Sequence, residues 1–154
     1  MRRAICFLIA AVSLLLAPGA EAMIQLDRGI AGARIGNTKA EVRAALGAPR
    51  SVVKRNGEFG RTTTYSYRGG LRVIFLEGRV TLAGTTGRGD RTNRGIGVGS
   101  TEQAVKDKVP GVTCETFEGT RLCQRGAREP GQQGTIFFIE GGRVTRVDVA
   151  LLID

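Results

Sequence analysis

The sequence predicts an α+β fold made of two tandem repeats, each a short helix packed on an antiparallel sheet of about four strands. Three observations lead to this prediction: an internal repeat with one nearly constant offset, a capped helical stripe in each copy, and short strand-like segments separated by glycine-containing turns. Removing residues 1–22 from the 154-residue chain leaves 132 residues. That length suits one domain, or two very small ones that share a core.

Residues 1–22 have the pattern of a cleavable secretory signal peptide. A basic pair at positions 2–3 precedes the apolar run 5–16, which is too short to span a bilayer comfortably. The small-x-small sequence Ala20-Glu21-Ala22 follows, so we expect cleavage after Ala22. The alternative is a retained membrane anchor. Cys6 lies at the start of the apolar run rather than after it, so acylation of the mature chain is not expected.

The internal repeat covers most of the mature chain. Three pairs of segments match at an offset of 63 or, after one inserted glycine, 64 residues: 36–38 with 99–101, 73–78 with 136–141, and 79–81 with 143–145. We assign repeat one to residues 23–93, ending in a polar linker, and repeat two to residues 94–154.

Each copy begins with a segment that is expected to form a helix of about ten residues. Asn37 or Thr38 can cap the first helix, and Thr38 with Glu41 has the spacing of a capping box. A Gly-x-Pro sequence ends the helical stripe. The second helix is expected to start at Ser100 or Thr101 and to stop at 110–111. Helices this short are not stable alone, so they need a sheet to pack on.

The strands are expected after each helix. They are 51–55, 62–67, 73–76 and 79–85 in repeat one, and 112–117, 120–124, 135–139 and 143–152 in repeat two. Segments 73–76 and 136–139 are apolar at every position, whereas a half-exposed antiparallel strand alternates. We therefore expect both faces to be covered, one by the helices and the other by neighbouring loops or a partner, with burial inside one monomer favoured.

Counting along a hairpin places the two cysteines of the mature chain opposite each other. With Glu118-Gly119 as a two-residue turn, Phe117 pairs with Thr120, and Cys114 then faces Cys123. Directly opposed residues lie about 4.5–5.5 Å apart, which a disulfide can bridge. An even number of cysteines in an exported chain also favours one disulfide. The alternative is a pair of free thiols.

Composition argues against most catalytic classes and leaves binding functions. The sequence has no His, so it lacks a Ser-His or Cys-His nucleophile pair, and a metal site would lack the usual ligands. We expect no enzyme activity, no cofactor and no metal. Loss of two arginines and one glutamate with the signal peptide changes the formal charge from +9 to +8. A basic exported protein is attracted to anionic surfaces or nucleic acid.

The motifs resemble a known superfamily. Ile35-Gly36-x-Thr38-x-x-x-Val42 with a following Leu-Gly-x-Pro is similar to the repeat of β-lactamase inhibitor proteins and of small outer-membrane-assembly lipoproteins. The second copy, with Cys114 and then Cys123-Gln124-Arg125-Gly126, is closer to the inhibitor type. The resemblance implies two helix-plus-sheet units in one curved sheet, with helices on the convex side and a concave side that grips a partner.

The binding residues we expect are Phe59, Tyr65, Tyr67 and Arg72. Tyr65 and Tyr67 share one face by the period of two, and Arg72 on the next strand lies near them in some turn registers. Tyr and Arg are frequent anchors of interfaces. The alternative is that both tyrosines cover the edge of the core.

The function we expect is therefore binding of another protein by an exported, non-enzymatic module in the periplasm or outside the cell. Its narrower form is inhibition of a secreted or periplasmic enzyme. Two alternatives remain: a basic binder of polyanions or envelope surfaces, and a structural or assembly factor of the envelope.

Overall fold

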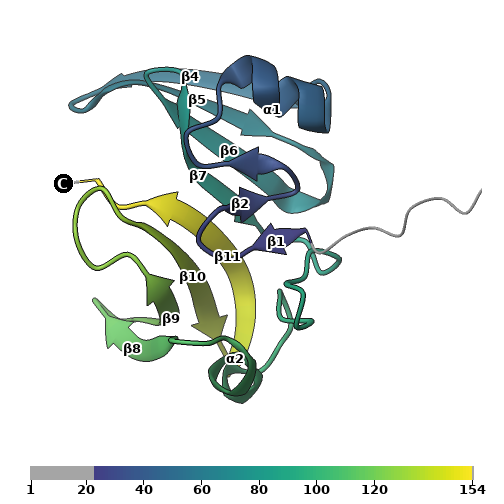
Figure 1. Ribbon diagram of the computed structural model, residues 1–154, viewed down its shortest axis with the longest axis vertical. Coiled ribbons are helices and arrows are strands. Elements are labelled where there is room, and N and C mark those ends of the chain that lie inside the picture. Colours follow the sequence, from purple (N-terminus) through teal and green to yellow (C-terminus); the bar gives the residue numbers. More distant parts are fainter. Residues whose placement is uncertain (1–22, 154) are drawn as a thin grey trace, which may run out of the picture.

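One continuous antiparallel sheet of eight strands dominates residues 23–153, the part of the chain that the computed structural model describes (Figure 1). The strands are β4 (Ser51–Gly57), β5 (Gly60–Ser66), β6 (Leu71–Leu76), β7 (Arg79–Thr85), β8 (Thr113–Phe117), β9 (Thr120–Gly126), β10 (Gln133–Glu140) and β11 (Arg143–Leu151). Their order across the sheet is β4-β5-β6-β7-β11-β10-β9-β8. The predicted signal peptide and its cleavage after Ala22 lie outside the described residues.

This single sheet corrects the predicted fold class. The described residues are 50% strand and 14% helix, so the fold is mostly β rather than two tandem helix-on-sheet repeats. The two halves merge because β7 pairs with β11 over four residues on each strand, from Val147 opposite Thr85 to Ala150 opposite Leu82. The pairing removes two sheet edges that separate units would expose. Patterns within each copy carry no information about this contact between copies.

A second, small sheet at the N-terminus was not predicted. It consists of β1 (Ile24–Gln25), β2 (Gly29–Ile30) and β3 (Ala33–Arg34), and it packs against β7 and β11 (Figure 1). Strands of two residues are too short to show a period, so the pattern gave no signal. Gly29 allows the close approach, because a Cβ there would lie 2.0 Å from the carbonyl oxygen of Ala33.

The two α-helices follow their predicted caps. Helix α1 (Lys39–Leu46) has the capping box: the Thr38 side chain accepts from the Glu41 amide at 3.2 Å, and Glu41 Oε2 accepts from the Thr38 amide at 2.6 Å. Helix α2 (Glu102–Lys108) is capped by Thr101 rather than Ser100. A 3₁₀ turn, η1 (Arg68–Gly70), precedes β6.

Matched segments make matched contacts in the two halves of the sheet. The Gly36 amide donates to the Val80 carbonyl at 2.8 Å, and the Gly99 amide donates to the Val144 carbonyl at 2.7 Å. Arg79 and Arg143 each donate from Nη1 to the carbonyl of the corresponding glycine, at 3.2 and 2.9 Å. Each helix start is thus tied to the last strand of its own half.

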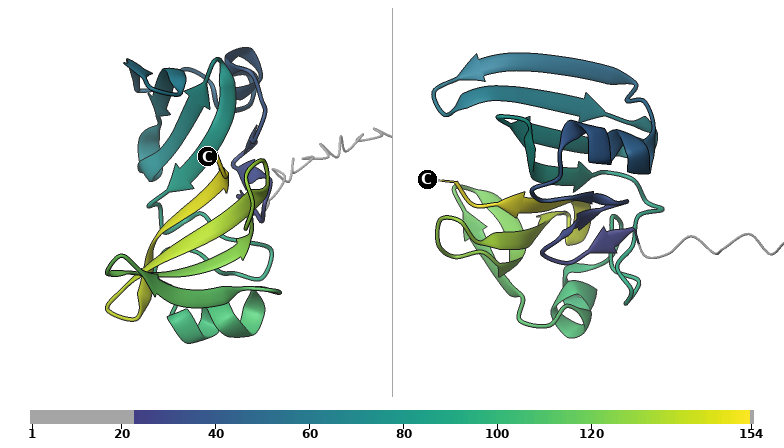
Figure 2. Two further views of the ribbon diagram at one scale, coloured as in Figure 1. Left: turned by 90° about the vertical axis from the view of Figure 1, so that its left-hand side faces the viewer. Right: turned by 45° about the horizontal axis from the view of Figure 1, so that its top comes forward.

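Helix α1, the small sheet β1–β3 and helix α2 all pack on one side of the long sheet. Figure 2 shows α1 and β1–β3 together on that side, and α2 contacts β9. The core sits between these elements and the sheet, and its largest fully buried side chains are Phe75, Phe137, Ile24, Ile30 and Ile96 with seven valines. Within the described residues no helix packs on the other side, which we call the open face.

The predicted disulfide is confirmed. Cys114 and Cys123 are directly opposed in the β8–β9 hairpin, with Phe117 opposite Thr120 as the two-residue turn requires, and their sulfurs are bonded. The hairpin is tied to α2, because Arg121 of β9 donates to Glu102 of α2. In the part of the chain that is described, no helix is long and apolar enough to cross a membrane.

Glu102 makes the unfolding free energy depend on acid pH. Hydrogen bonds from Arg121 and then Lys106 lower the pKa of Glu102 from 4.5 to about 2. A carboxyl with a lowered native pKa stabilises the fold above its unfolded pKa, and this stability is lost as pH falls from about 4.5 through about 2. We expect Glu102→Gln to lose less unfolding free energy than wild type over that range in urea titrations. The exposed Glu115→Gln should behave as wild type, and parallel curves for all three would contradict the prediction.

Candidate interaction site on the open face of the sheet

The strand register decides which side chains reach the open face. In the N-terminal half Thr64 pairs with Ile74, and Ile74 pairs with Leu82, so all three share this face. In the C-terminal half the open-face row is Leu122, Phe138 and Arg146 in one line and Ile136 with Asp148 in the next. Most of these side chains are partly buried by their neighbours in the sheet rather than by a covering layer.

A buried carboxylate lies at the centre of this face. Asp148 of β11 is only 4% exposed, and Arg146 Nε lies 3.1 Å from its Oδ2. The pair is close, but the Arg146 N–H is not aligned for a hydrogen bond, and Asp148 Oδ1 has no hydrogen-bond partner. Arg72 of β6 lies near enough to influence the carboxylate. We call Arg72, Arg146 and Asp148 the charged centre.

Gly84 makes room for this carboxylate. It is the cross-strand partner of Asp148 on β7, and a Cβ at Gly84 would lie 2.3 Å from Asp148 Oδ1. Burial raises the pKa of Asp148, while the positive charges of Arg146 and Arg72 act in the opposite direction. The net shift is upward, so the two arginines do not fully compensate the carboxylate for its lost water.

Arg146 is held in place by an aromatic ring. Its guanidinium carbon lies 3.6 Å from the centroid of Phe138, its cross-strand partner. A guanidinium stacked on a ring is attracted by the π-electrons and loses side-chain freedom before any partner arrives. Of the charged centre, Arg146 is therefore held in position by Phe138 before a partner binds.

An apolar groove adjoins the charged centre. It has a volume of about 550 Å³ and runs over β8, β9 and β10, and its larger apolar side chains are Phe117, Leu122, Ile136 and Leu152. Phe117 is 60% exposed and Leu152 is 39% exposed. Ile136 connects the two features, because it lines the groove and is the cross-strand partner of Asp148. The groove and the charged centre thus form one continuous surface.

Comparisons with known proteins show the fold and no family. No family model matches the sequence, and no curated protein matches it. An extracellular protein with an SCP domain from Bacillus anthracis is similar at TM-score 0.57 and 10% identity; the match covers 92% of this chain and 50% of that one. The uncharacterized protein yfeY from Escherichia coli is similar at a TM-score of 0.54 and 12% identity, and the match covers 84% of this chain and 98% of that one.

A DUF4309 family protein (YjgB) from Bacillus subtilis gives a TM-score of 0.51 at 18% identity, covering 85% of this chain and 88% of that one. This chain spans about half the length of the B. anthracis protein. At these identities the likeness concerns the fold alone. The resemblance to β-lactamase inhibitor proteins and outer-membrane-assembly lipoproteins stays a prediction.

The structure separates the four predicted binding residues. Tyr65 is 3% exposed and faces the core, where its ring packs edge-on to Phe75 at 4.8 Å, with Arg43 over it at 5.3 Å. Tyr67 is partly buried on the same side, and burial raises the pKa of its hydroxyl, which has no hydrogen-bond partner within the described residues. Tyr65 therefore has no surface to offer a partner, because α1 covers this side of β5.

Arg72 and Phe59 lie elsewhere. Arg72 pairs with Ser66 rather than with a tyrosine, which puts it on the open face and inside the charged centre. Phe59 is 64% exposed in the turn between β4 and β5. Sequence reasoning missed Asp148, Arg146 and Phe138. The available signal was an acidic residue flanked by valines inside an otherwise apolar strand, which is typical of a buried charge.

One cluster combines residue types that can bind metal. Oxygen and sulfur atoms of Glu102, Cys114 and Cys123 lie within 4.8 Å of one another. The two sulfurs are bonded to each other, so they do not present the thiolates that a metal requires. In the oxidised protein this cluster does not form a metal centre.

Proposed function

We propose that this protein is an exported, non-enzymatic protein-binding module that holds its partner on the open face of the sheet. The observation that carries the proposal is Asp148, a buried carboxylate with an unpartnered oxygen, lying between two arginines on a face that no described element covers. A buried acceptor left without a hydrogen bond is costly, so it is usually retained for a use.

The apolar character of the open face supports the same reading. An antiparallel sheet that faces water on one side normally carries polar side chains there. This face instead carries Ile74, Leu82 and Phe138, and the apolar groove continues them. A connected apolar surface rimmed by charge is typical of protein interaction sites.

The charged centre indicates the chemistry of the partner. Asp148 Oδ1 needs a donor, and Arg146 Nε is a donor that needs an acceptor. The exposed guanidinium of Arg72 offers further donors beside them. A peptide group or a side-chain amide supplies both at once. An apolar side chain beside that group would fill the groove next to Phe117. The partner is thus a protein loop with an amide group next to an apolar residue.

Export is supported by two independent features. The Cys114–Cys123 disulfide is typical of oxidising compartments, and the N-terminal pattern is that of a signal peptide cleaved near Ala22. One similar structure is that of an extracellular protein. Periplasmic and secreted locations both fit. Inhibition of a secreted enzyme is the narrower form of the proposal, and it applies where the bound loop belongs to an active site.

Two exposed phenylalanines provide a matched test. Residues 23–154 are immobilised, and proteins captured from envelope and culture-supernatant extracts are eluted along a salt gradient. We expect a protein that survives high salt, and Phe117→Ala or Arg146→Ala should weaken its affinity about tenfold or more, as for truncated interface anchors. Phe59→Ala is the control, because Phe59 is as exposed as Phe117 but lies in the β4–β5 turn.

The outcomes separate the alternatives. If Phe59→Ala and Phe117→Ala weaken the affinity for the captured protein equally, the result would contradict a binding site on the open face. Capture of only nucleic acid or lipopolysaccharide, released by moderate salt, would contradict protein binding and favour a polyanion binder, because phosphate contacts weaken steeply with salt. Association with the membrane fraction alone would favour an envelope assembly factor.

A further inference from the structure

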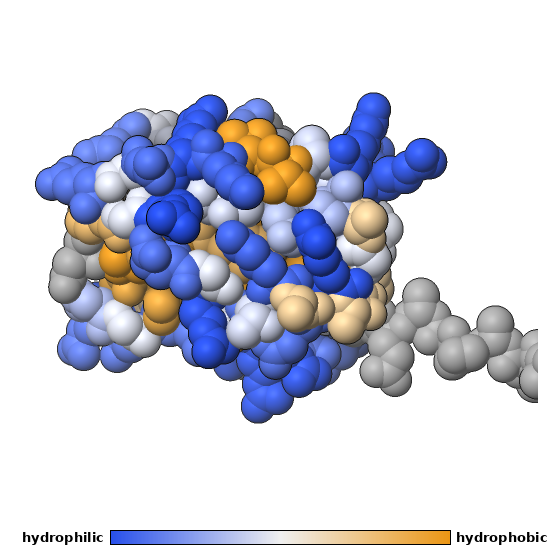
Figure 3. Space-filling view, turned by 90° about the horizontal axis from the view of Figure 1, so that it is seen from above, coloured by the Kyte–Doolittle hydropathy of each residue, from blue (hydrophilic) through white to orange (hydrophobic). Residues whose placement is uncertain are grey.

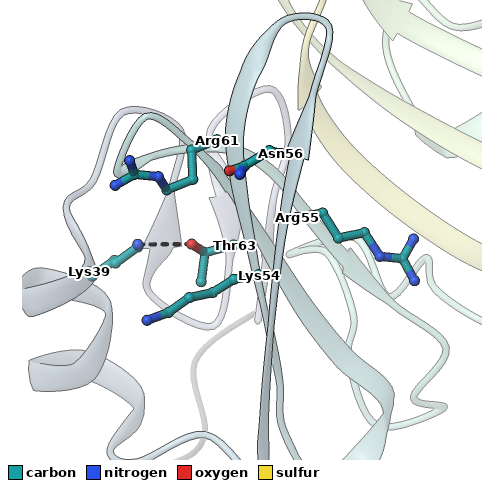
Figure 4. A pocket seen from close by; sticks show the side chains of 6 residues that line it. All are labelled: Lys39, Lys54, Arg55, Asn56, Arg61 and Thr63. Atoms are coloured by element: carbon teal, nitrogen blue, oxygen red, sulfur yellow. Dashed lines mark hydrogen bonds between the residues drawn. The ribbon is translucent and has the colours of Figure 1, made fainter.

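We propose that a second site, separate from the open face, binds a phosphate group in a basic pocket between α1 and the β4–β5 hairpin. The cavity has a volume of about 400 Å³. Its lining residues are Lys39, Lys54, Arg55, Asn56, Arg61 and Thr63 (Figure 4). Three cationic side chains, those of Lys39, Lys54 and Arg61, lie on the pocket side of the hairpin, and none of the six residues is acidic, so the pocket selects for negative charge.

The strand register brings three cations together on the helix side of the hairpin. Lys54 is the cross-strand partner of Thr63, and Asn56 is the partner of Arg61, so these side chains share one face. Lys39 approaches from the first residue of α1. Figure 4 shows Lys39, Lys54 and Arg61 on the same side of the hairpin as Thr63, whereas Arg55 points to the opposite side.

Within the described residues, no carboxylate forms a salt bridge with Lys39, Lys54 or Arg61. The salt bridges found within residues 23–153 involve other arginines and lysines. Two acidic side chains in this half of the sheet are already engaged by backbone groups: Glu77 accepts from the amide of Arg61, and Glu41 accepts from that of Thr38. Three positive side chains around one cavity repel each other, and an anion between them relieves that repulsion.

A buried hydroxyl forms the floor of the pocket. Thr63 is 2% exposed, and its Oγ1 accepts a hydrogen bond from Lys39 Nζ at 2.9 Å. The hydroxyl hydrogen of Thr63 and two ammonium hydrogens of Lys39 remain as donors. The same ammonium lies 5.9 Å from the ring centroid of Phe75, which helps to hold it in position. The floor therefore presents fixed donors, unlike a lysine free in solvent.

The donor set matches a phosphate group. Ammonium, guanidinium, amide and hydroxyl donors converge, and a phosphate offers several acceptor oxygens with up to two negative charges. The surface over β4 is mainly hydrophilic, with separate apolar patches rather than an apolar cleft (Figure 3). A small anionic group thus fits better than an apolar ligand. Free phosphate and an anionic phospholipid headgroup share this chemistry.

Arg55 provides a matched control for the test. Residues 23–154 are titrated with inorganic phosphate, with backbone amide shifts measured by NMR, and floated with phosphatidylcholine vesicles that do or do not contain phosphatidylglycerol. Lys54→Gln and Arg61→Gln should each weaken phosphate binding about tenfold, the effect of losing one charge-assisted hydrogen bond. Arg55→Gln removes the same charge from the neighbouring position but from the other side of the strand, and it should bind as wild type.

Each result decides the proposal. Amide shifts in residues 61–63 with phosphate alone support a site for free phosphate. Flotation that needs phosphatidylglycerol and is lost in Lys54→Gln, but retained in Arg55→Gln, supports the lipid headgroup as the source. Equal weakening by Arg55→Gln, or no binding in either arm, overturns the pocket. Because Lys54→Gln and Arg61→Gln change only the helix side of the hairpin, failure here does not affect partner capture through Phe117.

Discussion

Replacing Phe137 with alanine is expected to lower the free energy of unfolding by about 3–5 kcal/mol, the usual cost of removing a buried aromatic ring. Phe137 is fully buried in β10, with Cys123 and Val147 as its cross-strand partners. It lies where the sheet meets its covering layer, so the backbone cannot collapse into the space that the ring leaves. Urea unfolding followed by circular dichroism measures this loss.

An exposed phenylalanine on the same sheet supplies the control. Phe117→Ala should change the free energy of unfolding by less than about 0.5 kcal/mol, as for surface substitutions. Phe117 is 60% exposed at the end of β8. A small loss at Phe137, or equal losses at both positions, would contradict the placement of the core on the helix side of the sheet. The control also shows that weakened partner binding by Phe117→Ala does not result from unfolding.

The charged centre is expected to reduce stability. Replacing its Arg146–Asp148 pair with apolar side chains of similar volume, Arg146→Met with Asp148→Leu, should raise the free energy of unfolding by about 1–2 kcal/mol, because apolar packing often stabilises more than an ion pair whose carboxylate is buried. The carboxylate has an unpartnered oxygen and its pKa is raised by burial, so its lost hydration is not fully compensated. The same double variant should lose the partner captured by the open face.

The single variant Arg146→Met should lower the free energy of unfolding, the opposite of the effect expected for the double variant. It leaves the Asp148 carboxylate buried with less positive charge near it, and we expect a loss of about 1–3 kcal/mol, the cost of an unsatisfied buried group. Urea unfolding of the two variants beside wild type measures both effects. A destabilised double variant that still binds its partner would show that the charged centre serves the fold rather than an interface.

The pH dependence of the charged centre follows from the raised pKa of Asp148. The native chain binds this proton more readily than the unfolded chain, so stability falls as pH rises from the ordinary value of 3.8 through the native pKa. The trend is opposite to that of Glu102, whose native pKa is lowered. In the double variant the Asp148 contribution should be absent, while the Glu102 contribution remains.

Local features could be predicted from the sequence because they depend on neighbours along the chain. The Thr38–Glu41 capping box needs residues three apart, and the Cys114–Cys123 pairing follows from counting back from a two-residue turn. The matched segments 36–38 and 99–101 make the same hydrogen bonds to their strands, since the same side chains recur at nearly the same spacing. In each case the partner lies within one helix start, hairpin or half.

The face that each strand residue occupies was harder to predict. Arg72 was expected to lie near Tyr65 or Tyr67 in some turn registers, but the observed register, with Ser66 opposite Arg72, puts Tyr65 and Arg72 on opposite faces. A shift of one residue exchanges the two faces of a strand, and η1 between β5 and β6 sets that register. Segments 73–76 and 136–139 are apolar on both faces, yet only one face is covered within the described residues.

By itself, the sequence determined the caps, the hairpins, the disulfide and the separation of helix from strand segments. Only the tertiary structure decided that β7 pairs with β11, that residues 24–34 form a small sheet over this junction, and that Asp148 lies buried between Arg72 and Arg146. The physical reason is the separation along the chain between the residues that interact. Local propensity acts over a few residues, whereas one continuous sheet and a buried charge depend on strands that are about 60 residues apart.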